Sequence, residues 1–130
     1  GPGAAEGPER EVLELMGRAG ELITLDDEPL IEPAMALMSC GPAFMALWAE
    51  SFAKAGEAHG LDREAAMRMV VETMAGSAAW LARHGYDGAD LRARVATPGG
   101  TTEQGLIALE EGGLGDLVQA TVDQVVEATR

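Results

Sequence analysis

The chain has 130 residues, is 47% hydrophobic and carries 22 acidic against nine basic side chains. The formal net charge of −13 argues against nucleic acid or an anionic membrane surface as a partner. The single cysteine excludes an internal disulfide, and the sequence shows no metal-ligand cluster. Neither a secretory signal nor a run of about 18 apolar residues is found. We therefore expect a cytoplasmic protein with no membrane partner.

The first 26 residues contain one helix candidate and one strand candidate. Gly1-Pro2-Gly3 is typical of the scar left when a purification tag is removed. Apolar spacing predicts a short helix over residues 9–18, and Leu22-Ile23-Thr24-Leu25 is the strand candidate. Because a lone strand has no ladder to join, we interpret residues 1–26 as a tag remnant and the residual end of a sheet-containing domain.

Residues 27–130 read as helices throughout. An apolar segment over residues 30–39 is followed by a break at Gly41-Pro42 and a helix that Gly60 ends. Asp62 is the expected N-cap of the next helix, which reaches residue 83. Shorter helices are predicted over residues 90–96, 101–111 and 114–129. The fold class is therefore all-α.

One face of the predicted 62–83 helix is a stripe of apolar and small side chains. Its members are Ala66, Met69, Val70, Thr73, Met74, Ser77 and Trp80. Such a stripe favours a core or a subunit interface over a cofactor site, and the small residues Gly76 and Ala78 beside it would let a second helix lie close.

The segment Thr97-Pro98-Gly99-Gly100-Thr101-Thr102 has the features of an anion-binding turn before a helix. Pro98 forces the chain to turn, and the two glycines allow backbone N–H groups to face one concavity. Thr101 is the expected N-cap, with Gln104 at the capping-box spacing. A helix N-terminus of this kind suits a carboxylate or a phosphate. The alternative is a purely structural loop with a capped helix.

Three ordered blocks of sequence carry a resemblance to a known family. They are Asp26-Asp27-Glu28-Pro29-Leu30-Ile31 with Gly41-Pro42-Ala43-Phe44, then Ala55-Gly56-Glu57-Ala58-His59-Gly60-Leu61, then Leu91 to Leu114 around Pro98-Gly99-Gly100. From about residue 22 to the end, the chain resembles pyrroline-5-carboxylate reductase. The resemblance implies a helical bundle of the 6-phosphogluconate-dehydrogenase C-terminal-like type, assembled as an intertwined homodimer, with residues 1–26 ending a dinucleotide-binding domain and residues 27–130 forming the dimerisation and substrate-binding domain.

The resemblance also implies the chemistry of the whole enzyme. In that family NADPH or NADH delivers hydride to a cyclic imino acid, giving proline, and the substrate carboxylate lies in the loop that corresponds here to Thr97, Gly100, Thr101 and Thr102. No G-x-G-x-x-G follows a strand in this sequence, so the chain alone is expected to hold no cofactor tightly and to be inactive. Assemblies larger than the dimer stay open.

Five residues depart from the family pattern, and one of them, Ala93, replaces a frequent acidic residue before the Pro98-Gly99-Gly100 loop. Where the family usually has small hydroxyl side chains and a tyrosine, this chain has Met35, Met38, Cys40 and Phe44. The change leaves two alternatives, a pocket for a larger or more apolar imino acid and a diverged member without the activity. Two further alternatives for the chain are a stand-alone dimeric homologue that binds small acids and a helical interaction protein.

Three other residue groups have simpler interpretations. Cys40 has no activating neighbour in sequence, which favours a buried small apolar role over a nucleophile. The acidic run Asp26-Asp27-Glu28 is typical of a helix start, with cation binding as the alternative. His84 is expected at a helix C-terminus, where its charge is favourable, rather than as a catalytic base.

Overall fold

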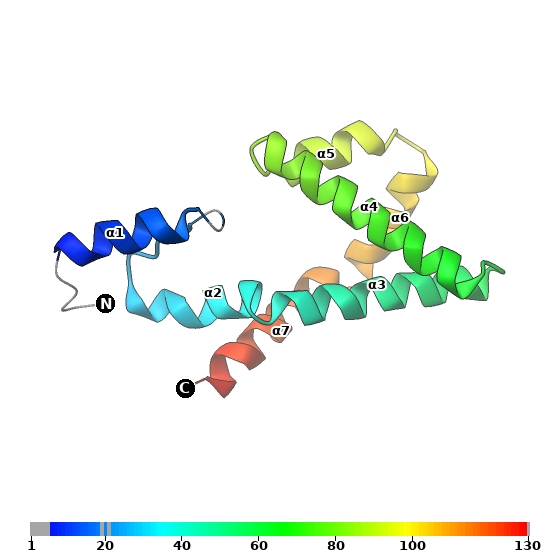
Figure 1. Cartoon of the computed structure of the whole chain (residues 1–130). Helices are drawn as coiled ribbons and strands as arrows, with labels where there is room; N and C mark the ends of the chain where they lie inside the picture. Colours follow the sequence, from blue (N-terminus) through cyan, green and yellow to red (C-terminus); the bar gives the residue numbers. More distant parts are fainter. Residues whose placement is uncertain (1–5, 19, 21, 130) are drawn as a thin grey trace.

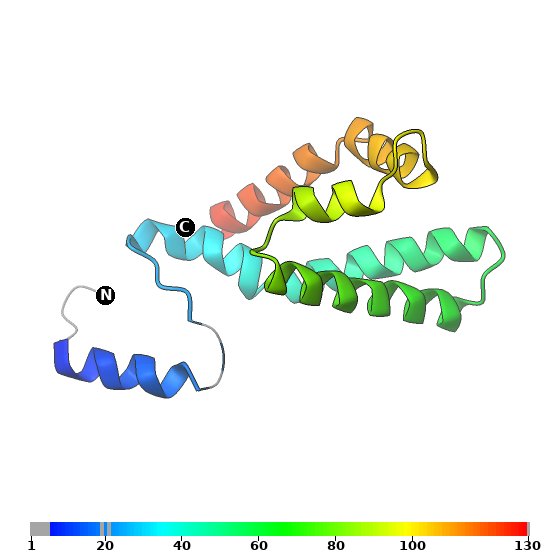
Figure 2. The same cartoon turned by 90° about the horizontal axis from the view of Figure 1, so that it is seen from above.

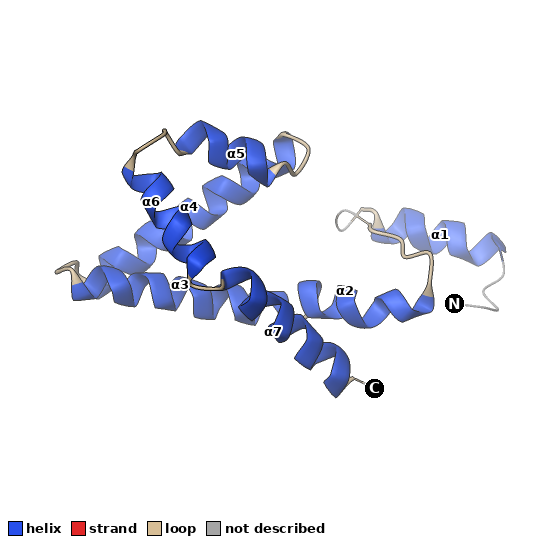
Figure 3. Ribbon diagram, turned by 180° about the vertical axis from the view of Figure 1, so that it is seen from behind, coloured by secondary structure: helices blue, strands red, loops and turns tan. Residues whose placement is uncertain are grey.

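The computed structural model describes residues 6–18, 20 and 22–129, and the regular elements in that part of the chain are all helical. They are α1 (Glu6–Met16), the short 3-10 helix η1 (Glu28–Leu30), α2 (Ile31–Met38), α3 (Gly41–Ala58), α4 (Arg63–Arg83), α5 (Gly88–Val95), α6 (Thr101–Glu111) and α7 (Leu114–Ala128). Figure 3 shows helices joined by loops. The predicted all-α class is confirmed.

The strand predicted at Leu22-Ile23-Thr24-Leu25 is wrong, because these four residues have no regular structure. No second strand among the described residues can supply a ladder, and isolated strands are unstable. The helix predicted over residues 9–18 corresponds to α1, which begins earlier, at Glu6. α1 lies apart from the rest of the molecule in Figures 1 and 2. Gly1-Pro2-Gly3 lies outside the described residues, and the division at residue 26 stays a prediction.

Helices α2 and α3 follow each other almost end to end, with the predicted break at Gly41-Pro42 between them (Figure 1). Pro42 is accommodated because it stands in the first turn of α3, where its missing N–H has no intrahelical partner to lose. The end of α2 is closed by the carbonyl of Met35, which accepts from the amides of Ser39 and Cys40 at 2.9 and 3.1 Å.

By the test of length and composition, the helical segment Glu28–Ala58 is apolar enough to cross a membrane, and little of its apolar stretch is buried. The prediction that the sequence has no run of about 18 apolar residues is therefore wrong, because the apolar character continues on both sides of the break at Gly41-Pro42. A core or interface helix passes the same test, so the finding identifies exposed apolar surface and does not identify what covers it.

Helices α3 and α4 form a hairpin whose contact is lined by alanine. The fully buried apolar residues among those described are Ala36, Ala49, Ala53 and Ala66, and three of these four lie in α3 and α4. At Gly56 of α3, an added Cβ would stand 3.1 Å from a side-chain carbon of Leu61, so glycine permits the close approach near the turn. Asp62 caps α4 as predicted, accepting from the amide of Ala65 at 3.0 Å.

The remaining helices extend from this hairpin. Helix α7 packs across α2, and α6 packs on α7, while α5 turns back from the C-terminal end of α4 (Figures 1 and 2). Large apolar side chains stay exposed along several helices. They include Leu37, Met38, Met45, Leu47, Phe52, Met69, Leu117 and Val118. A single chain therefore buries small side chains and leaves the large ones uncovered.

Candidate functional site

The turn between α5 and α6 is built by Thr97, Pro98, Gly99 and Gly100. After α5 the chain becomes extended at Ala96, and the amide of Gly100 then donates to the carbonyl of Thr97 at 2.9 Å. Gly99 has a φ of +74°, a left-handed conformation that L side chains adopt at a cost. The glycine pair therefore provides the reversal that the sequence analysis expected.

Thr97 lies directly against Gly100. A Cβ added at Gly100 would stand 2.5 Å from the hydroxyl oxygen of Thr97 and 2.9 Å from its carbonyl oxygen. No larger residue fits at position 100 while this turn is kept. Two of the four residues that the resemblance assigns to the loop are therefore in contact, and the reason for glycine at position 100 is steric.

The cap of α6 differs from the prediction by one residue. Gly100 is the N-cap, and Thr101 is already the first helical residue. The reciprocal bond comes from Glu103, whose Oε2 accepts from the amide of Gly99 at 2.7 Å. The prediction of Thr101 as N-cap with Gln104 as its capping-box partner is wrong, because the extended backbone of Gly100, with ψ 170°, already starts the helix.

Three backbone donors at the start of α6, the amides of Thr101, Thr102 and Glu103, have no acceptor among the described residues. Thr101 and Thr102 are both exposed. These amides point along the positive end of the helix dipole, which favours an anion. The amide of Gly100, in contrast, is used inside the turn. The structure thus brings Thr97, Gly100, Thr101 and Thr102 together, but only the last two offer free amides.

Glu103 is the residue of this turn that the sequence analysis missed. Its half-buried carboxylate places a negative charge beside the donors that an anionic ligand would use. The sequence could have indicated this bond, because Glu103 is the third residue of a helix that starts directly after two glycines. From that position a carboxylate can reach back to a free amide before the helix. An anion bound at Thr101 and Thr102 has to share this helix end with Glu103.

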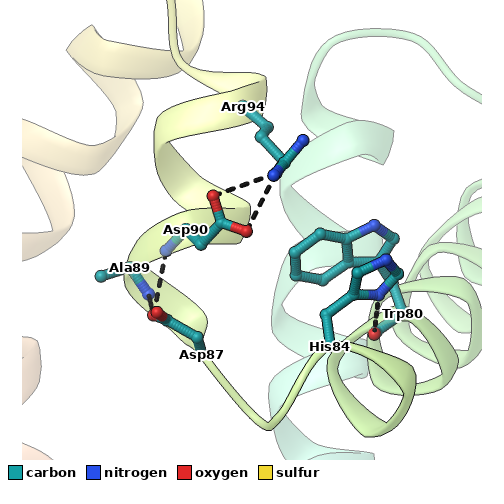
Figure 4. A network of polar contacts seen from close by, with 6 residues as sticks. All are labelled: Trp80, His84, Asp87, Ala89, Asp90 and Arg94. Carbon is teal, nitrogen blue, oxygen red and sulfur yellow. Dashed lines mark hydrogen bonds and ion pairs between the residues drawn. The ribbon is translucent and has the colours of Figure 1, made fainter.

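A second polar cluster joins the C-terminal end of α4 to α5 (Figure 4). The His84 ring stacks on Trp80 with centroids 4.0 Å apart, and its Nδ1 donates to the Trp80 carbonyl at 2.7 Å. Arg94 lies 5.7 Å from the Trp80 ring centre and donates from Nε to both carboxylate oxygens of Asp90, at 3.0 and 2.9 Å. His84 is the C-cap residue of α4, the position that the sequence analysis expected.

Met35, Met38, Cys40 and Phe44 lie around the junction of α2 and α3. Phe44 lines a cavity of about 310 Å³ between α2, α3 and α7, together with Trp48, Leu117 and Val118. Met35 and Cys40 are half-buried, and Met38 is exposed. Cys40 is therefore less buried than predicted, because it stands at the start of α3 rather than inside a helix contact.

A second groove of about 330 Å³ lies between α3 and α4. It is lined by Trp48, Phe52, Met69, Val70, Thr73, Met74 and Ser77. Five of these residues belong to the stripe predicted on the 62–83 helix, so that stripe faces α3 and an open apolar groove. The assignment of the stripe to a core or an interface agrees with this position.

The acidic run at residues 26–28 leads into η1, with Glu28 in its first turn and the carbonyl of Asp27 accepting from the amide of Leu30 at 3.1 Å. Within residues 22–129 and the described part before them, no group of three or more His, Cys, Asp or Glu side chains could hold a metal ion. The run is thus placed at a helix start, as the favoured interpretation states.

Comparison with known proteins identifies the domain. Residues 28–130 match the family model described as pyrroline-5-carboxylate reductase dimerisation. The chain is 45% identical over 113 residues to pyrroline-5-carboxylate reductase of Neurospora crassa, covering 86% of this chain and 32% of the relative. It is 36% identical over 102 residues to pyrroline-5-carboxylate reductase 2 of Bacillus subtilis, covering 78% of this chain and 35% of the relative.

Solved structures give the same result. A pyrroline-5-carboxylate reductase from Coxiella burnetii aligns with a TM-score of 0.90 at 30% identity, covering 98% of this chain and 47% of that one. The Plasmodium falciparum enzyme, with NADP bound, aligns with a TM-score of 0.84 at 26% identity and covers 98% of this chain and 48% of that one. The chain spans about a third of the length of the two curated relatives. It belongs to the pyrroline-5-carboxylate reductase dimerisation family.

Proposed function

We propose that this chain is the dimerisation and substrate-carboxylate-binding part of an oxidoreductase that reduces a cyclic imino acid to proline or a proline analogue. The carboxylate-binding part of this proposal is supported by one observation, the open amides of Thr101 and Thr102 at the positive end of α6. The family match and the exposed large apolar side chains support the homodimer. We infer that a second copy, rather than a bilayer, covers the apolar faces of α2 and α3.

The chain contributes binding and orientation to this reaction. A nicotinamide cofactor, when bound to the whole enzyme, supplies the hydride that adds to the C=N carbon, while the nitrogen takes a proton. The sequence holds no glycine-rich dinucleotide turn after a strand, and the described residues hold no βαβ unit, so we assign these residues no contact with the phosphates of the cofactor. Holding the carboxylate at one helix end fixes the position of the ring that carries the C=N bond.

The test removes one amide and leaves the helix intact. In Thr101→Pro the donor at position 101 disappears, and proline is tolerated there because it is the first helical position. The preceding Gly100 has φ −81° and ψ 170°, which suits a residue before proline. Thr101→Ala is the matched control, since it removes the hydroxyl and keeps the amide.

Calorimetric titration measures the affinity of each variant for L-proline. We expect Thr101→Pro to weaken binding about 10- to 100-fold, the value of a hydrogen bond to a charged group, whereas Thr101→Ala changes it little. Equal affinity of Thr101→Pro and the parent chain would contradict the role of the amides. Circular dichroism confirms that both variants keep their helices.

A dimeric helical interaction protein is the second candidate. The observation that favours it is Glu103, whose carboxylate already occupies the Gly99 amide and makes the turn self-sufficient. Absence of any heat with L-proline, in a chain that sediments as a dimer, would support this candidate over the first. A single cysteine and the family assignment support a cytoplasmic location, which stays part of the proposal.

A further inference from the structure

Acidic and basic residues are distributed unevenly along this chain. Residues 19–53 contain six acids and no Lys or Arg, and residues 96–129 again contain six acids and no Lys or Arg. In contrast, residues 54–95 contain six of the nine bases and are close to charge balance. The negative net charge is thus concentrated in residues 19–53 and 96–129.

The fold brings the two base-free segments together. Helix α2, from the first segment, packs against α7, from the second (Figures 1 and 2). The exposed acids on these helices and on η1 include Glu28, Asp116, Asp123 and Glu127. We call the assembly of η1, α2 and α7 the acidic arm.

No described acid of the acidic arm has a cationic partner. The ion pairs of the described residues in and around α3 to α5 join Glu57 to Arg63, Glu64 to Arg68 and Asp90 to Arg94. On α7, the carboxylate of Asp123 accepts only from the amide group of Gln119, at 2.9 Å, and that donor is neutral. The charge of the arm is therefore uncompensated among the described residues.

The same arm carries apolar surface that a second chain has to cover. Leu37 on α2 is 69% exposed, and Leu117 and Val118 on α7 are 67% and 52% exposed. These three residues line the 310 Å³ cavity between α2, α3 and α7. Covering this surface moves the acids of the arm closer to the second copy.

In a twofold dimer the same patches of both copies form the contact, so like charges approach one another. The acids Asp116, Asp123 and Glu127 share one side of α7 by their spacing, and a helix is only about 10 Å thick. Their repulsion therefore acts across the contact when the Debye length is about 30 Å, at about 0.01 M salt, and is largely screened at about 1 M, where that length is about 3 Å.

We propose that uncompensated charge on the acidic arm makes homodimer formation of this chain depend on ionic strength, so that salt promotes assembly. The inference rests on the homodimer of the proposed function and is independent of the ligand site. It concerns the balance between two properties of one surface, the apolar area that drives association and the carboxylates that oppose it.

Sedimentation velocity across NaCl concentrations tests the proposal. We expect the dimer dissociation constant to fall at least about tenfold between about 0.01 M and 1 M NaCl, because repulsion is screened over this range. The test variant, Asp116→Asn with Asp123→Asn and Glu127→Gln, removes three charges from the arm and should flatten this dependence. The matched control, Glu57→Gln with Glu64→Gln and Glu72→Gln, removes three charges from the balanced region and should retain most of it.

Sucrose at about 1 M separates screening from a general strengthening of apolar burial, since it is uncharged and excluded from protein surfaces. Sucrose in place of salt should not restore the dimer at low ionic strength. A dimer whose dissociation constant is independent of salt, or equal salt slopes for the two triple variants, overturns the proposal and leaves the homodimer intact. A chain that stays monomeric at every salt concentration overturns both.

Discussion

The α3–α4 hairpin and the pair formed by α2 and α7 use apolar residues in opposite ways. In the hairpin, Ala49, Ala53 and Ala66 are buried, and Gly56 leaves room for the Leu61 side chain near the turn. On α2 and α7 the large side chains, such as Leu37 and Leu117, face outward. Small residues therefore form the contacts within one chain, whereas the large residues are left exposed and can contact a second molecule.

A single-chain core made of alanine buries little apolar area, and hydrophobic stabilisation scales with that area. The isolated chain therefore gains little from its own contacts, and most of its apolar side chains can be buried only by another molecule. This agrees with a dimerisation domain, in which folding and association are closely coupled.

A charge placed in the uncovered apolar surface should produce the largest effect. Val118→Asp puts a carboxylate into the lining of the cavity between α2, α3 and α7. Burial of an unpaired charge costs several kcal/mol, so we expect the dimer dissociation constant to rise about 100-fold or more. Sedimentation equilibrium at about 1 M NaCl, where repulsion between exposed charges is largely screened, measures this change.

Ala120→Asp is the matched control for that variant. It adds the same charge to the same helix at an exposed position two residues away, on the other side of α7. A dimer that tolerates Ala120→Asp and not Val118→Asp places the contact on the apolar side of α7. Equal behaviour of both variants would contradict the assignment of this surface to the interface.

A larger residue in the alanine contact should have an intermediate effect, on stability. Ala66 is 2% exposed, and Ala66→Leu would force three further carbons between α3 and α4. Overpacking of this kind costs about 1–3 kcal/mol. Urea denaturation should show this loss, whereas Ala75→Leu, at an exposed position of the same helix, should stay within about 0.5 kcal/mol of the parent. An undisturbed Ala66→Leu would mean that the hairpin is loosely packed.

Helix positions were predictable from sequence because they depend on local chemistry. Asp62 caps α4, glycine occurs where φ is positive at Gly60 and Gly99, and the last two helices begin where the pattern places them. The strand at residues 22–25 failed for the complementary reason. Its apolar and β-branched residues satisfy the local pattern, but a strand requires a partner, which the described chain does not provide.

The site was predicted in position but not in detail. The turn before α6 lies where the sequence puts it, yet the cap is Gly100 rather than Thr101, and the reciprocal acid is Glu103 rather than Gln104. A one-residue shift changes which side chain reaches back, because the cap is set by backbone dihedral angles that two glycines leave open. Sequence spacing therefore located the turn and missed the carboxylate inside it.

The smallest expected effect concerns the part of the molecule that depends on local bonds rather than on either apolar surface. Helix α6 packs on α7, and its start is closed by the bond from the Gly99 amide to Glu103. Glu103→Ala removes that bond, and loss of a capping interaction costs about 1 kcal/mol, so the Gly99 amide should exchange with solvent about fivefold faster or more. Amide exchange followed by NMR measures this.

Glu103→Gln keeps an acceptor and should restore most of the protection, whereas Glu110→Ala, in the last turn of the same helix, should leave the Gly99 amide unchanged. Unaltered exchange at Gly99 in Glu103→Ala would show that the turn is held by Gly100 and Thr97 alone, and the start of α6 would then be free to accept an external carboxylate without displacing its own.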